Sequence, residues 1–239
     1  AGFITIKGKT GVRPVITVTN TTQCIEQGSF NLWWFDNLEL AQQGASGNVI
    51  ADANTSNACV FVNIKISDGG GVGKAMSNSS MKHISMEITG VGGDGFSGAG
   101  NNMFTHGCYV HDVTGDGYEC TAANPAASFV NNCIFDTCGA RGLFFSGAAT
   151  VTTNNQVING CTIYGCGNSG LEVTDADMQV VITNSIFSEN GDAAGEYNVE
   201  WAAGAAEYVS FHGWNVFYHS GGGGGANLSG LTANAQVAS

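Results

Sequence analysis

Charge, proline and long apolar runs are scarce in this sequence. Lys and Arg number only 7 among 239 residues, against 19 Asp and Glu, and there are 2 prolines. The net charge of −12 argues against nucleic acid and anionic membranes as partners, because both are bound through clustered cations. No apolar run reaches the roughly 18 residues of a membrane-spanning helix, which argues against membrane insertion. Periodic segments rich in Ala, Glu, Lys and Leu are absent, which excludes a helical bundle or coiled coil.

Glycine and hydrophobic residues are abundant instead. The 36 glycines are about double the average share. Hydrophobic residues make up 43% of the chain, which excludes a disordered protein. Low charge combined with many Asn, Thr, Ser and Gly is typical of exported or particle-surface proteins, so we expect an extracellular location, secreted or on a virion.

A repeat of short apolar strands runs through the chain. Six segments share a template of alternating apolar residues, a glycine-rich corner and a second short strand, and they begin near Val62, His83, Gly107, Asn132, Gly160 and Asn184. The corner glycines are 22, 25 and 28 residues apart, at Gly95, Gly117, Gly142 and Gly170. This period is too short for a βαβ unit and is typical of stacked β-coils. We predict an all-β protein, a single-stranded parallel β-helix (a solenoid) of about eight coils.

Alternation within the repeats predicts which side chains point into the coil. The first and third residues of a segment such as Cys133–Phe135 point inward at period two. Stacked coils then form one inward column of Ile84, Cys108, Cys133, Cys161 and Ser185, and a second of Met86, Val110, Phe135, Ile163 and Phe187. At the corners, we expect glycine to supply the positive φ of sharp turns.

The cysteines follow the same repeat. Cys138 and Cys166 share a column in which the preceding coil has Val113. A valine in this column indicates small buried side chains rather than metal ligands. Individual disulfides stay open, and Cys24 and Cys59 are the best candidates because they lie outside the columns.

The first forty residues carry a resemblance to a known superfamily. Phe3–Gly8, followed by Arg13–Ile16, leads into the coil Asn31–Leu40. This arrangement resembles the entry coil of the pectate-lyase-like superfamily of right-handed parallel β-helices, and the resemblance covers most of the chain. It implies right-handed coils, in agreement with the right-handed crossover rule.

The expected organisation is one β-helix domain over residues 1–239, as a piece of a longer chain. We place an entry coil at 1–40, regular coils at 60–200 and a last coil at 208–235. Open coil ends are aggregation-prone edges, so caps or neighbouring subunits, including copies of the same chain, are expected to cover them.

One polar column directly precedes the corner glycines. It holds Asp94, Asp116, Arg141 and Ser169, and Glu119 and Glu172 can face the same side. Equivalent residues of neighbouring coils lie about 4.8 Å apart. We therefore expect two aspartates in this column either to raise the pKa of one of them or to bind Ca²⁺.

Two interpretations of this column stay open. Asp94, Asp116, Glu119 and Arg141 are candidate catalytic residues, either as an acid/base pair for glycoside hydrolysis or, with Ca²⁺ on Asp94 and Asp116, as the site of a lyase. Alternatively, both aspartates are turn residues of Asp-Gly corners and Arg141 pairs with Asp116.

Aromatic residues supply candidate sugar platforms. Trp33, Trp34 and Tyr118, together with Glu172, are the candidate substrate-binding residues. Adjacent strand residues face opposite sides, so one of the two tryptophans is expected to point outward. The resemblance brings no catalytic motif with it, because Thr105–Gly107 and Gly115–Gly117 only faintly echo the polygalacturonase elements and no Arg-Ile-Lys element is present.

Two functions are expected from these features. The first is a non-catalytic structural or surface module, such as a fibre, adhesin or virion-surface protein, that contacts glycans. The alternative is a polysaccharide lyase or glycoside hydrolase acting on an acidic polysaccharide, with Ca²⁺ as the candidate cofactor. Low charge and missing catalytic motifs favour the first.

Overall fold

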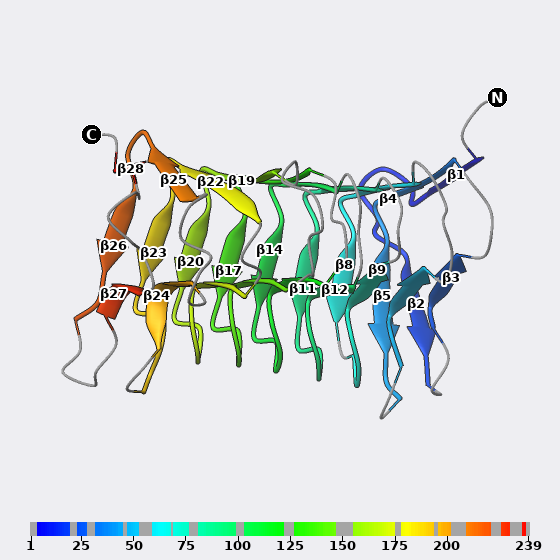
Figure 1. Ribbon diagram of the computed structural model, residues 1–239. Helices are drawn as coiled ribbons and strands as arrows, with labels where there is room; N and C mark the ends of the chain where they lie inside the picture. The colour runs from blue at the N-terminus through cyan, green and yellow to red at the C-terminus, as the bar shows by residue number, and fades with distance from the viewer. Residues whose placement is uncertain are drawn as a thin grey trace.

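The chain is wound into a parallel β-helix in the computed structural model (Figure 1). Each coil contributes one strand in turn to three parallel sheets, here called A, B and C, that run along the molecule. The structure describes residues 4–19, 23–27, 32–44, 47–52, 59–67, 69–76, 81–98, 103–121, 127–146, 155–174, 178–193, 196–201, 209–220, 226–229 and 236–237.

The strands follow each other in the order A, B, C. Sheet A contains β1 (Ile4–Lys7), β4 (Trp33–Asp36), β7 (Cys59–Val62), β10 (Met81–Ile84), β13 (Phe104–His106), β16 (Ser128–Asn131), β19 (Asn155–Asn159), β22 (Gln179–Thr183), β25 (Val209–His212) and β28 (Gln236–Val237). Sheet B contains β2 (Val15–Val18), β5 (Glu39–Gln42), β8 (Lys65–Ser67), β11 (Glu87–Thr89), β14 (Tyr109–His111), β17 (Ile134–Asp136), β20 (Thr162–Tyr164), β23 (Ile186–Ser188) and β26 (Val216–Tyr218). Sheet C contains β3 (Ile25–Gln27), β6 (Ile50–Asp52), β9 (Lys74–Met76), β12 (Phe96–Gly98), β15 (Tyr118–Cys120), β18 (Leu143–Phe145), β21 (Leu171–Val173), β24 (Tyr197–Trp201) and β27 (Ala226–Ser229).

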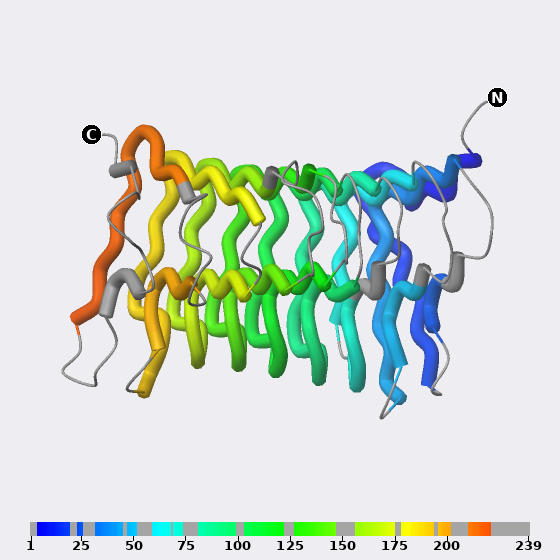
Figure 2. Tube along the Cα trace, viewed as in Figure 1, coloured from blue at the N-terminus to red at the C-terminus, as the bar shows by residue number. Residues whose placement is uncertain are grey.

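The predicted all-β parallel β-helix is confirmed. Among the described residues, sheet A has ten strands and sheets B and C have nine each, so the coils slightly exceed the predicted eight. Successive coils follow nearly the same path (Figure 2). Within the described part of the chain, no helix is long and apolar enough to cross a membrane.

The core is a set of side-chain columns inside the coil. Val110, Phe135, Ile163 and Phe187 stand in register on β14, β17, β20 and β23, and all four are buried, as predicted. In the preceding coil, the residue in register is Ile88 and not Met86, because Ile88 pairs with Val110. The prediction was wrong there by two residues. Met86 and Ile88 both face inward, so a period of two does not reveal this slip. The same slip misplaced Ile84, which was expected in the column of Cys108 but is half-buried and pairs with His106, because the left-handed corner at Ser85 interrupts the alternation.

The sharp corner between sheets A and B uses one residue in the left-handed conformation. Asn63, Asn132 and Asn184 occupy this position with φ of 52°, 51° and 50°, and Gly107 and Gly160 occupy it with φ of 62° and 64°. Asparagine and glycine tolerate this conformation better than other residues. The corner therefore repeats with suitable residues in most coils, and Ser85, with φ of 52°, is the exception.

The glycines before the strands of sheet C serve a different purpose from the one predicted. Gly95, Gly117 and Gly142 do not have positive φ. A Cβ on Gly117 would lie 2.6 Å from Cδ1 of Phe135 and 2.7 Å from the carbonyl oxygen of Gly142. Glycine is needed at this corner because a core side chain and the next coil approach the backbone too closely for any side chain.

The cysteines are buried thiols. All eight cysteines are free, and seven of them are buried. Cys24 and Cys59, the best candidates for a disulfide, are therefore not bonded to each other. The predicted column of Val113, Cys138 and Cys166 is buried as well. A hydrogen bond with the neighbouring thiol of Cys108, together with burial, raises the pKa of Cys133. These thiols therefore act as small apolar side chains of the core.

Substituting Gly117 tests the packing explanation. Gly117→Ala should lower the free energy of unfolding by about 3 kcal/mol, because neither Phe135 nor the facing backbone can withdraw. Gly107→Ala is the matched control, since its Cβ would meet nothing closer than 3.7 Å and only the left-handed conformation opposes it, at about 1 kcal/mol. Urea unfolding measures both. Equal losses in the two variants would contradict the packing explanation.

Candidate functional site on the outer face of sheet C

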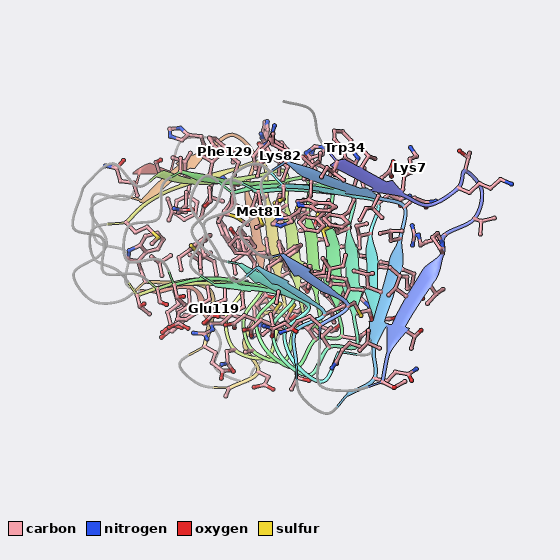
Figure 3. All side chains as sticks on the ribbon, turned by 90° about the vertical axis from the view of Figure 1, so that its right-hand side faces the viewer. Lys7, Trp34, Met81, Lys82, Glu119 and Phe129 are labelled. Carbon is pink, nitrogen blue, oxygen red and sulfur yellow. The ribbon has the colours of Figure 1, made fainter. Side chains whose placement is uncertain are left out.

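An outward column of polar residues crosses sheet C. Ser97, Glu119, Phe144, Glu172 and Glu200 stand in register on five consecutive strands. They point outward because the residues on either side of them in each strand fill the core at period two. Glu119 lies on the side of the coil opposite Lys82 and Phe129 of sheet A (Figure 3). The column offers a row of functional groups about 4.8 Å apart along the helix axis.

The corner column next to it is tied together by hydrogen bonds. Oδ1 of Asp94 accepts the backbone N–H of Asp116 at 2.8 Å. The Asp116 carboxylate is buried and accepts three bonds from Arg141, namely the backbone N–H at 2.9 Å, Nε at 2.8 Å and Nη2 at 2.9 Å. A guanidinium that bonds both carboxylate oxygens is the strongest geometry for such a pair. The corner is therefore rigid.

Arg141 also reaches across to the outward column. Its Nη1 donates to Oε2 of Glu172 at 3.0 Å. The guanidinium carbon lies 3.3 Å from the centroid of the Phe144 ring, which adds a cation–π contact. Two carboxylates and one aromatic ring thus hold the guanidinium in place, so Arg141 acts here as a fixed cation and not as a mobile base.

Glu119 is the carboxyl group with the most unusual environment. Partial burial raises the pKa of Glu119, and the nearby Asp94 and Asp116 carboxylates raise it further. The hydroxyl of Ser97 donates to Oε2 of Glu119 and opposes this shift, because the bond favours the ionised form. A carboxyl group that keeps its proton longer than usual is suited to donate it.

The structure brings together five of the sequence-derived site residues, namely Asp94, Asp116, Glu119, Arg141 and Glu172. The simpler interpretation of the corner also holds, since Asp94 caps the turn and Arg141 pairs with Asp116. The Asp116 oxygens proposed for Ca²⁺ are bonded to the guanidinium. No group of three or more His, Cys, Asp or Glu residues that could hold a metal ion occurs in the described ranges.

The aromatic part of the prediction needs correction. Tyr118 is wholly buried, because it is the first residue of β15 and points inward, so it offers no platform to a ligand. Trp33 is half-buried, with its ring 5.9 Å from that of Phe35. Trp34 is exposed, as expected for one of the pair, but it belongs to sheet A, on the opposite side of the coil from Glu119 (Figure 3).

Sequence reasoning missed Ser97, Phe144 and Glu200. Ser97 and Phe144 follow a corner glycine by two positions, as Glu119 and Glu172 do, and that offset could have identified them. Glu200 is harder to find, because Asn198 stands where the glycine is expected. Glu200 accepts a bond of 2.8 Å from the buried hydroxyl of Ser169, which extends the network by one coil.

Substituting Arg141 tests how much its buried pair with Asp116 stabilises the protein. Arg141→Ala removes both guanidinium bonds and leaves the buried Asp116 charge with the backbone N–H of residue 141 as its remaining donor, so we expect a loss of about 3 kcal/mol in the free energy of unfolding. Arg141→Lys should lose less, because the charge remains while the forked geometry is lost. The control is Lys65→Ala, which breaks the 3.0 Å surface pair with Glu87 and should cost about 1 kcal/mol or less. Similar losses for Arg141→Ala and Lys65→Ala would refute the buried-pair argument.

The raised pKa of Glu119 predicts a direction in the pH dependence of stability. The folded protein holds this proton above the usual pKa of 4.5, so the free energy of unfolding falls as pH rises from that value through the folded-state pKa. Glu119→Gln should remove this contribution to the pH dependence of the free energy of unfolding. Ser97→Ala should move the contribution to higher pH, because the Ser97 hydrogen bond lowers the pKa of Glu119. Urea unfolding at a series of pH values measures the effect. A Glu119→Gln profile parallel to the wild type would contradict the assignment.

Comparison with known proteins identifies the family of this fold. A family model described as "Right handed beta helix region" matches residues 48–229. No curated protein sequence matches the chain. Among solved structures, the A-module of the Azotobacter vinelandii mannuronan C-5 epimerase AlgE4 is similar, with a TM-score of 0.58 and 13% identity over 100% of this chain and 82% of that one. The A-module of AlgE6 from the same organism matches at a TM-score of 0.43 and 12% identity, over 91% of this chain and 80% of that one. The predicted relationship is thereby confirmed, and the chain belongs to the right-handed β-helix family.

Proposed function

We propose that this protein is a non-catalytic β-helical module, extracellular or on a particle surface, that contacts polysaccharide through the outer face of sheet C. The observation that carries the proposal is the outward row of Ser97, Glu119, Phe144, Glu172 and Glu200, of which Arg141 contacts Phe144 and Glu172. The similar solved structure supports contact with a polysaccharide, because its name gives it activity on mannuronan. Mannuronan is a uronate chain, so the choice between acidic and neutral glycans rests on the charge of the face alone.

The arrangement suits an extended glycan. Hydroxyl and carboxylate groups in the row can bond sugar hydroxyls, and the Phe144 ring can pack on a sugar face. The row is pre-organised by strand register and by the Arg141 network, which reduces the ordering entropy lost on binding.

The charge of the face selects among glycans. The guanidinium of Arg141 bonds Asp116 and Glu172, and the same face carries three further carboxylates: Asp94, Glu119 and Glu200. A uronate chain would be repelled unless cations bridged it, whereas a neutral glycan meets no such barrier. The geometry thus favours a neutral polysaccharide over the acidic one first considered.

Glycoside hydrolysis is the second candidate, and the raised pKa of Glu119 favours it. Glu119 would protonate the glycosidic oxygen, and Glu172 would take a proton from the water that attacks the anomeric carbon. Their strands are two spacings apart, or roughly 9.6 Å, which is close to the carboxyl separation of inverting enzymes. A lyase is less well supported, since Arg141, its candidate base, is bonded to two carboxylates.

A combined binding and cleavage assay tests this proposal. Wild-type protein is run through gels containing neutral β-glucan, xylan, pectate or alginate, with and without EDTA, and reducing ends and ultraviolet absorbance of unsaturated uronates are followed. We expect retardation by a neutral glycan without product. Phe144→Ala should bind about five- to tenfold more weakly. Asp36→Asn, which alters a carboxylate of sheet A, should bind like the wild type.

Each other outcome has a defined meaning. Reducing ends that disappear in Glu119→Gln would replace the binding module with a hydrolase. Metal-dependent ultraviolet product would establish a lyase instead. Absence of both retardation and product with folded protein would overturn the proposal.

A further inference from the structure

The outer face of sheet B changes character along the molecule. Its strands lie side by side across the front of the view (Figure 1). The first strand, β2, exposes Val15, but on β8 and β11 the outward groups are charged and paired, as in the 3.0 Å bond between Lys65 and Glu87. From β14 onward, exposed apolar and aromatic side chains replace them, each with 37–55% of its surface exposed. We call these the tyrosine strip: Tyr109, Ile134, Tyr164, Ile186, Val216 and Tyr218.

Strand register arranges the strip in two parallel columns. Tyr109, Ile134, Ile186 and Val216 belong to one column. Tyr164 and Tyr218 stand two strands apart in the other. The strip crosses five strands, or about 19 Å, and its columns are about 7 Å apart. It is a narrow band parallel to the helix axis.

Polar groups are interleaved with the rings. The Tyr109 hydroxyl donates to Oδ2 of Asp136 at 3.3 Å, and the Tyr109 ring is stacked on His111 with centroids 4.2 Å apart. His111 in turn contacts Asp112 at 2.7 Å. Hydrogen-bonding groups therefore border the apolar surface at its Tyr109 end.

A one-residue insertion adds a tryptophan near the end of the strip. In the coil of β22 and β23, two residues separate Thr183 from Ile186. Their partners in the next coil, His212 and Val216, are separated by three. The additional residue places Trp214 at the corner, where 88% of its surface is exposed. An indole in this position, next to Val216, lengthens the aromatic surface.

The dimensions and charge of the strip identify its occupant. A stable contact between two copies buries about 800 Å² on each partner, and a band of this length and width offers only a few hundred. The net charge of −12 also opposes pairing of two copies. A long, narrow ligand with apolar faces and hydroxyl edges fits both the tyrosine rings and the polar border. Asp112 and Asp136 beside the rings disfavour an anionic ligand.

We propose that the tyrosine strip is a glycan-binding surface for an extended neutral polysaccharide, separate from the face of sheet C. The inference rests on the proposed function, because it assumes that the protein contacts polysaccharide. The sugar rings stack on Tyr109 and Tyr164, and their hydroxyls bond the polar groups beside them. Sheet B then binds the same class of ligand as sheet C but with aromatic rings in place of carboxylates.

Affinity electrophoresis in soluble neutral β-glucan, with pull-down on microcrystalline cellulose and chitin, tests the strip. Tyr164→Ala should bind about five- to tenfold more weakly than the wild type. Tyr164→Phe keeps the ring and should stay within about twofold. Phe129→Ala removes an equally exposed ring from sheet A and should leave binding unchanged. Circular dichroism confirms that each variant is folded.

Comparison with Phe144→Ala separates the two proposals. Weakening by Tyr164→Ala alone would support the strip and overturn the role of sheet C, and weakening by Phe144→Ala alone would do the reverse. Equal weakening by Phe129→Ala and Tyr164→Ala would overturn the strip as a specific surface. A concentration-dependent dimer in sedimentation velocity, abolished by Tyr164→Ala, would replace the glycan with a second copy. Wild-type protein that none of the glycans retains would overturn both proposals.

Discussion

Backbone hydrogen bonding between parallel strands of successive coils is the constraint on which this molecule depends. Because the bonds hold each coil in register with the next, residues at the same position of successive coils form a column in which neighbours lie about 4.8 Å apart. Inside the coil, the columns form the core, as with Val110, Phe135 and Ile163. Outside, the same register aligns Glu119, Phe144 and Glu172. Core and candidate site are thus two faces of one repeat.

The close approach of the coils also explains the rigidity of the candidate site. At the corner before sheet C, the backbone passes so near to Phe135 that only glycine fits at Gly117. The residue before it, Asp116, is buried by the same approach, and a buried carboxylate requires a partner. Arg141 of the next coil provides that partner and extends to Glu172. Tight packing therefore leads directly to a fixed cation at the surface.

Much of this was accessible from the sequence, and the failures have physical causes. Glycine spacing and alternation predicted the β-helix and the polar column from Asp94 to Arg141. They could not detect the two-residue slip at Met86, which preserves alternation. The inward direction of Tyr118 was accessible, because Tyr118 directly follows a corner glycine, as Phe96, Leu143 and Leu171 do. Side-chain contacts, such as that of Ser97 with Glu119, depend on neighbouring coils and are not encoded in any local pattern.

A regular coil also allows its faces to diverge in chemistry without disturbing one another. Outward residues of sheets B and C make no contribution to the buried columns, so carboxylates collect on one face and tyrosines on another while the core stays constant. The small number of Lys and Arg residues is consistent with this arrangement. Arg141 is engaged at the site and Lys65 is paired with Glu87, so neither of these two cations is free to bind an acidic chain. If the proposed function holds, we expect both faces to repel polyanions and to retain groups that suit uncharged sugars.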